Sequence, residues 1–111
     1  MRVNTNNLQG AALDWAVAKC EGHGIGSLDD PWFAPSSDWA QGGPIIEREK
    51  IALTWYPDDK EWIAGVDFQH PRFSNVIAYE EQYGPTPLIA AMRCYVASKL
   101  GEEVDVPEEL K

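Results

Sequence analysis

The sequence predicts a small α+β domain, in which two principal helices pack on a short antiparallel sheet and a long ordered loop is rich in Gly and Trp. Three observations predict this fold class. Segments 84–101 and 8–21 have the apolar periodicity of helices, and two β-rich runs flank a turn at 57–60. The chain has 111 residues, enough for one modest core, and 44% of them are hydrophobic.

The first helix is predicted at 8–21, with Gly22 as its stop. One of the polar residues at 5–7 could cap its N-terminus. Leu13 belongs to the apolar face of this helix, whereas Trp15 projects nearly opposite to it. Either the following loop folds over Trp15, or Trp15 belongs to a contact surface.

Residues 22–44 are predicted to form an ordered loop, because a segment that carries three aromatic residues is rarely disordered. A short strand is expected at 45–48. The runs 51–56 and 61–68 alternate in hydrophobicity on either side of the turn at 57–60, which predicts an antiparallel hairpin. One face of this hairpin should meet the helices.

The sequence leaves the structure of 69–83 open, although 76–79 could add a strand. The second principal helix is predicted at 84–101, and the sequence contains residues typical of a helix N-terminus and a helix C-terminus at its two ends. Thr86 can cap the first free N–H groups, a proline occupies the first helical position, and Gly101 suits the left-handed residue after the end.

Residues 1–101 are interpreted as a single domain and residues 102–111 as an acidic, solvated tail. The net charge of -9 repels phosphate backbones and therefore argues against nucleic-acid binding. It leaves room for a small anionic ligand held by local cations, and for a basic protein partner. The apolar runs are shorter than the roughly 20 residues that span a bilayer, and the N-terminus lacks a signal-peptide core. We therefore expect a protein of the cytoplasm that does not bind membranes.

Arg93 lies within the apolar arc of the second principal helix. An isolated buried charge is costly, so its guanidinium should reach solvent or pair with a carboxylate. Asp14, Asp38 and Glu47 are the candidate partners. The functional alternative is an anion clamp at the edge of a pocket.

Residues 38–44 form the second candidate site. The paired glycines Gly42 and Gly43 permit unusual backbone conformations and let a ligand approach the main chain. Trp39 could stack on a flat ring, and Asp38 could accept a hydrogen bond from a ribose hydroxyl or a guanidinium. The alternative interpretation is a tight turn that leads into the next strand.

Signals of catalysis are weak in this chain. No Ser or Cys lies in a recognisable nucleophile motif, and His23 and His70 belong to no ligand-spaced cluster. Cys20 and Cys94 are interpreted as buried free thiols. We therefore predict a non-enzymatic protein without a metal or a cofactor.

Segments 10–19, 37–48, 84–101 and 104–110 resemble the NinX-like family of tailed bacteriophages and prophages. The resemblance implies a phage-encoded accessory protein of unknown function that acts in the bacterial host cytoplasm, and it supplies no catalytic residue. The residues singled out above lie in the family-like segments, and we hypothesise that they meet in space. They are Trp15, Asp38, Trp39, Gly42, Gly43 and Arg93.

Three functions follow as hypotheses. The first is an accessory protein that binds and modulates a host or phage protein, since an acidic surface with spare aromatic residues suits that role. The second is a binder of a small nucleotide-like anion, which could sequester a host defence signal with Trp39 stacking, Arg93 clamping and main-chain donors at the glycines. An enzyme whose motif is unfamiliar is the third. Trp15 or an exposed strand edge could support a homodimer.

Overall fold

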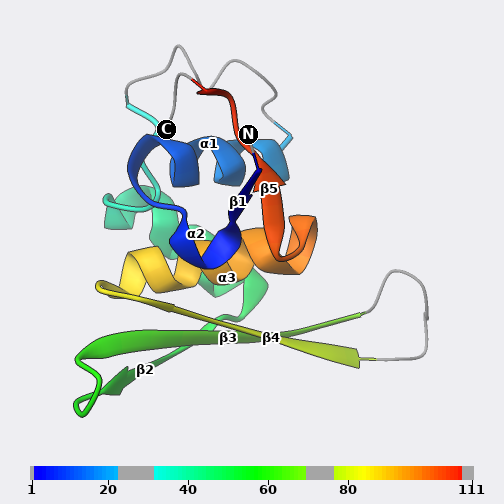
Figure 1. Cartoon of the computed structure of the whole chain (residues 1–111). Coiled ribbons are helices and arrows are strands. Elements are labelled where there is room, and N and C mark those ends of the chain that lie inside the picture. Colours follow the sequence, from blue (N-terminus) through cyan, green and yellow to red (C-terminus); the bar gives the residue numbers. More distant parts are fainter. Residues whose placement is uncertain (1, 23–31, 70–76, 109–111) are drawn as a thin grey trace.

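The computed structural model describes residues 2–22, 32–69 and 77–108, and of residues 67–69 and 77–79 only the backbone. Figure 1 shows the helices gathered on one face of a three-stranded sheet, as expected for an α+β domain. In chain order the elements are β1 (Arg2–Asn4), the 3-10 helix η1 (Thr5–Asn7), α1 (Gly10–Cys20), α2 (Trp39–Glu49), β2 (Ala52–Tyr56), β3 (Glu61–Gln69), β4 (Ile77–Gly84), α3 (Pro87–Leu100) and β5 (Glu103–Asp105).

The larger sheet is antiparallel throughout, in the order β2-β3-β4. Tyr56 pairs with Glu61 across the turn, so the predicted hairpin is confirmed. One register step further, Trp55 pairs with Trp62, and their ring centroids are 5.5 Å apart. β4 extends to Gly84 and fills much of the stretch that the sequence left open.

The α3 helix forms as predicted. The Thr86 hydroxyl accepts the N–H of Ile89 at 3.1 Å, and Gly101 follows the last turn with a φ of 93°. Residues 90–97 are all buried, because α3 packs against the sheet, α1 and α2 at once. A helix that is enclosed on most sides needs apolar residues around its circumference, which explains its weak amphipathicity.

The capping of α1 differs from the prediction. Residues 5–7 form η1, and the residue before α1 is Gln9, which makes no side-chain capping bond. Thr5 is occupied elsewhere, since its hydroxyl donates to the Gly101 carbonyl at 2.7 Å. The end of the helix is close to the prediction, and Gly22 follows it with a φ of 82°.

The largest correction concerns α2, because the predictions of a loop through residue 44 and a strand at 45–48 are both wrong. Asp38 caps this helix by accepting the N–H of Ala40 at 3.0 Å, and Lys50 ends it in the left-handed conformation. Pro44 lies inside the helix on its exposed side and leaves the carbonyl of residue 40 without its usual helical donor. Residues 23–31 of the predicted loop, and with them His23, lie outside the described residues, as does His70.

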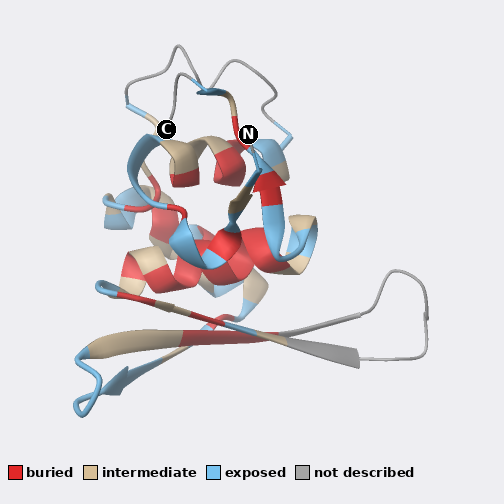
Figure 2. Ribbon diagram, in the orientation of Figure 1, coloured by how far each residue is buried: buried red, intermediate tan, exposed pale blue. Residues whose placement is uncertain are grey.

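The core lies between α3 and its neighbours (Figure 2), and it includes Leu13, Val17, Met92 and Val96, each fully buried. The segment after α3 also contributes to the core. Val104 in β5 is 4% exposed, and β5 pairs with β1. Part of the segment predicted as a solvated tail is therefore a strand of the fold.

Candidate functional site

Asp38 and Trp39 lie at the start of α2, beside a hollow of about 290 Å³. The Asp38 carboxylate accepts from Ala40 and from the Gln41 side chain, so it serves the local structure. The Trp39 side chain is 54% exposed. The hollow is lined by Ser36, Ser37, Trp39, Thr86, Pro87, Leu88 and Ile89. Both α2 and α3 thus begin at this hollow, which is mostly apolar apart from its hydroxyls.

Gly42 and Gly43 lie inside α2 and have different roles. A Cβ atom on Gly42 would lie 2.5 Å from the Pro35 carbonyl oxygen and 2.6 Å from Cδ2 of Leu88. Only glycine therefore lets α2 approach α3 this closely. A Cβ atom on Gly43 would have its nearest neighbour, Trp39, at 4.0 Å. The glycine pair is thus helical, and one of its members is a packing residue.

Trp15 is partly buried against the core, on the side of α1 away from Leu13. The Lys19 ammonium lies 5.2 Å from the centre of its ring, one turn further along the same helix. This distance fits a cation–π interaction, which stabilises the exposed side of the indole. Trp15 is not among the residues that line the Trp39 hollow.

Arg93 is 8% exposed and donates to two backbone carbonyls, Leu8 O at 2.7 Å and Tyr83 O at 2.8 Å. Among the described residues it forms no ion pair with Asp14, Asp38 or Glu47, so the predicted partners are wrong. Burial lowers the pKa of its guanidinium, and the charge of Glu61 partly offsets this. Arg93 joins three segments: the entry to α1, the end of β4, and α3.

The structure therefore divides the predicted site into separate parts. Asp38, Trp39 and the two glycines share the first half of α2, where Gly42 packs on Leu88 of α3. Five residues after Leu88 along the same helix, Arg93 points about 140° around the helix axis. Its guanidinium is held toward Leu8 and β4 and is not part of the Trp39 hollow.

Asp14 connects α1 to the segment before α2, because its carboxylate accepts the N–H of Ser36 at 2.9 Å. Burial raises the pKa of the Asp14 carboxyl, and the hydrogen bonds from Ser36 offset part of this rise. The carboxylate form is therefore less favourable in the folded protein than in water.

Replacing Asp14 with Asn is expected to stabilise the protein slightly at neutral pH and to have little effect near pH 3. The pKa of the Asp14 carboxyl is higher in the folded protein than in the unfolded chain, where it is about 3.9. Its contribution to the free energy of unfolding is therefore fully present below the unfolded pKa. This contribution is lost as the pH rises through the folded pKa. The amide keeps the acceptor oxygen without the charge. Urea unfolding of both proteins at the two pH values measures the difference, and a gain confined to acid pH would contradict this explanation.

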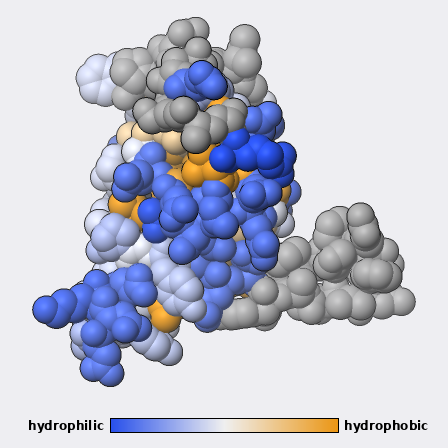
Figure 3. All heavy atoms as spheres, in the orientation of Figure 1, coloured by the Kyte–Doolittle hydropathy of each residue, from blue (hydrophilic) through white to orange (hydrophobic). Residues whose placement is uncertain are grey.

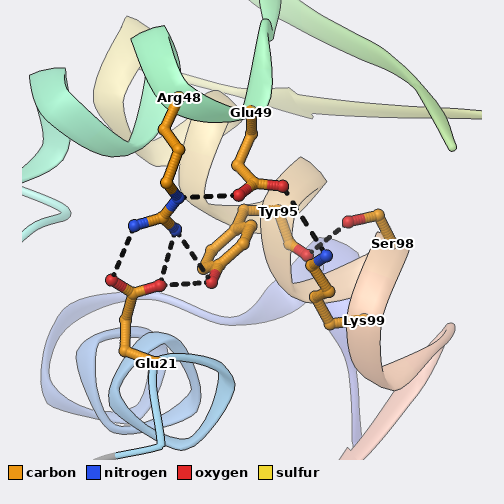
Figure 4. Close-up of polar contacts among 6 residues, drawn as sticks. All are labelled: Glu21, Arg48, Glu49, Tyr95, Ser98 and Lys99. Atoms are coloured by element: carbon orange, nitrogen blue, oxygen red, sulfur yellow. Dashed lines mark hydrogen bonds and ion pairs between the residues drawn. The ribbon is translucent and has the colours of Figure 1, made fainter.

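Sequence reasoning missed a polar cluster where the C-terminal turns of α1, α2 and α3 meet (Figure 4). Arg48 binds both carboxylate oxygens of Glu21, at 3.1 and 2.7 Å, and its Nε donates to Glu49 at 2.8 Å. The Tyr95 hydroxyl donates to Glu21 and accepts from Arg48. Lys99 Nζ lies 3.6 Å from Glu49. The cluster was missed because the sequence predicts a strand at 45–48, although a basic residue in the last turn of a helix is a recognised signal.

This cluster joins helices and gives no sign of reactivity. Its two carboxylates and two cations balance in charge, and the cations complement the negative ends of α2 and α3. Burial, with the neighbouring Glu21, raises the pKa of Tyr95 above its ordinary value. Burial likewise raises the pKa of the Cys20 thiol to about 12, so this thiol stays protonated at neutral pH. Both cysteines are free, and burial also raises the pKa of Cys94 to about 12.

The three-stranded sheet has one face that no described helix covers (Figure 1). Ala64 and Val66 are buried in the core on the α3 side, so Ile63, one position away, points to the other side. The register places six described polar, aromatic or β-branched side chains on that side, together with Ala52 and Gly65. We call this surface the open face, and it consists of Thr54, Tyr56, Glu61, Ile63, Glu81 and Tyr83.

The open face is acidic and aromatic. The Tyr83 hydroxyl donates to Glu81 at 3.0 Å, and this bond, with the charge of Glu81, raises the pKa of Tyr83. The charge of Glu61 acts on Tyr83 in the same direction. Tyr56 is 47% exposed, and Ile63 is partly exposed. An uncovered sheet face that carries a β-branched residue and two phenols is suited to contact with another molecule.

Among the described residues visible in Figure 3 the surface is mostly hydrophilic, and hydrophobic residues show only in small separate patches. None of the described helices combines the length and apolarity needed to span a bilayer. Nor do three or more His, Cys, Asp or Glu residues in the described ranges come together as a metal site.

The comparison with protein-family models agrees with the resemblance in the sequence. The family model described as Bacteriophage P22, NinX matches residues 4–99. This range extends from the end of β1 to the last turn of α3 and includes every strand of the larger sheet. The comparison with curated proteins finds no match. The chain belongs to the Bacteriophage P22 NinX family.

Proposed function

We propose that this phage-family protein is a non-enzymatic accessory protein that binds and modulates a host or phage protein in the bacterial cytoplasm. The open face carries this proposal. It combines an apolar centre at Ile63 with flanking phenols, and none of the described helices covers it. Aromatic residues are enriched in protein interfaces because they bury a large area with few rotatable bonds. Burial raises the pKa of both thiols, which argues against Cys20 and Cys94 as nucleophiles.

Ile63→Lys is expected to weaken capture of a partner from host lysate at least about tenfold, because it places a charge at the centre of the contact. The melting temperature should change little, since Ile63 lies on the open face and not in the core. Quantitative mass spectrometry of proteins retained by wild-type and variant baits measures the loss. Asn7→Lys, which adds the same charge at an exposed position of η1, is the control. Equal capture by the Ile63→Lys bait would refute the role of this face.

A small nucleotide-like anion remains the second candidate, favoured by one observation: the half-exposed Trp39 indole beside the hollow where α2 and α3 begin. Trp39 could stack on a base there, without help from Arg93. A bound nucleotide would raise the melting temperature of the wild type but not of Trp39→Ala. If no nucleotide does so, this candidate is eliminated, and the protein-binding proposal is unaffected.

A further inference from the structure

We infer that the occupant of the open face is a basic segment of the partner, in which an apolar residue lies between two Lys or Arg residues. This inference rests on the proposed protein-binding function and adds the chemistry of the partner. It follows from the positions of the two carboxylates relative to the apolar centre.

The sheet register orders the open face into three rows. Tyr56 and Glu61 form the first row, and Thr54, Ile63 and Tyr83 form the second. In the third row Glu81 lies beside Gly65. Successive rows are two residues apart along β3, which is roughly 7 Å. The face therefore has a carboxylate on each side of an apolar and phenolic centre.

No described Lys or Arg occupies a register position on this face. Glu81 is exposed, and the hydrogen bond that it receives from Tyr83 leaves its second oxygen available to a further donor. Glu61 interacts at longer range with the charge of Arg93, whose guanidinium is held by backbone carbonyls. Incoming cations would thus meet two carboxylates without displacing an internal ion pair.

Charge decides between the possible occupants. A second copy of this chain would place acidic open faces against each other, and like charges in an interface are unfavourable. Nucleic acid is disfavoured by the same carboxylates and by the net charge of -9. A basic segment is attracted to both rims, and an Arg side chain can also stack on the rings of Tyr56 and Tyr83.

A random peptide library selected on the whole chain tests this inference. We expect the enriched peptides to carry an apolar residue between two basic ones. Their binding should weaken about tenfold for the Glu61→Gln/Glu81→Gln double variant, because two exposed ion pairs are lost. Glu47→Gln/Glu102→Gln makes the same charge change at two exposed positions elsewhere and should alter binding less than about twofold. Amide chemical shifts should change along β2, β3 and β4.

The outcomes separate the inference from the function on which it rests. Neutral or acidic peptides that lose binding to Ile63→Lys would overturn the basic occupant and leave the docking face in place. Peptides that bind Ile63→Lys as well as wild type would overturn both. Basic peptides that are indifferent to the two glutamine substitutions, or a library that yields no binder, would also overturn the inference.

Discussion

Arg93→Met is expected to lower the melting temperature by more than about 10 °C, the largest effect of any single change proposed for this protein. The substitution removes the donors to the carbonyls of Leu8 and Tyr83 while keeping much of the side-chain volume. Each buried carbonyl left without a donor costs roughly 1–3 kcal/mol. Thermal unfolding followed by circular dichroism measures the loss.

Arg2→Met is the matched control, because Arg2 lies at the surface and contacts Glu103 at 3.4 Å. An exposed pair of this kind contributes at most about 1 kcal/mol. Arg93→Lys should fall between the two, since one ammonium cannot reproduce the two donor directions of a guanidinium. A Met variant that melts like the wild type but no longer binds a small anion would restore the anion-clamp hypothesis for Arg93.

The second large effect is expected at the two adjacent glycines of α2. Replacing each with alanine should change the free energy of unfolding, with opposite signs for the two positions. Gly42→Ala forces a methyl group against the Pro35 carbonyl and Leu88, so the helix must move, at a cost of roughly 1–3 kcal/mol. Gly43→Ala meets no close neighbour, and alanine is favoured over glycine in a helix by about 0.5–1 kcal/mol.

Urea unfolding of the two single variants measures the change in the free energy of unfolding for each, and hence its sign. Because the substitutions are chemically identical and adjacent, each is the control for the other. If both variants were stabilised, α2 would pack more loosely on α3 than the structure shows. If both were destabilised, residues 42 and 43 would have to adopt a conformation other than a helix.

The sequence was sufficient for elements whose signals are local. The Thr86 cap, the following proline and Gly101 define α3 within one continuous segment. The hairpin was equally predictable, because the turn and the alternating runs adjoin each other. By contrast, α2 was missed because Gly42, Gly43 and Pro44 all disfavour helix, and the packing that outweighs them depends on Pro35 and Leu88.

The candidate site was less predictable than the fold. The position of Arg93 in an apolar arc correctly indicated that it needs partners, but these are backbone carbonyls, one of them 85 positions away. Because every residue has a backbone carbonyl, the sequence could not indicate which carbonyls would accept hydrogen bonds from Arg93. The open face was also hidden, because alternation separates the two sides of a hairpin without showing which side α3 covers.

The contacts of the N-terminal segment have a consequence for synthesis. β1 pairs with β5, Thr5 bonds to the carbonyls of Gly101 and Glu102, and the Leu8 carbonyl accepts from Arg93. Residues 2–8 therefore leave the ribosome long before the segments that hold them. β2, β3 and β4 also emerge before α3 and β5, and the pairing of β1 with β5 waits until residue 105 has emerged. A polypeptide stalled after β4 would leave β1, Thr5 and the Leu8 carbonyl without these partners, so quality-control proteases could reach its opening residues.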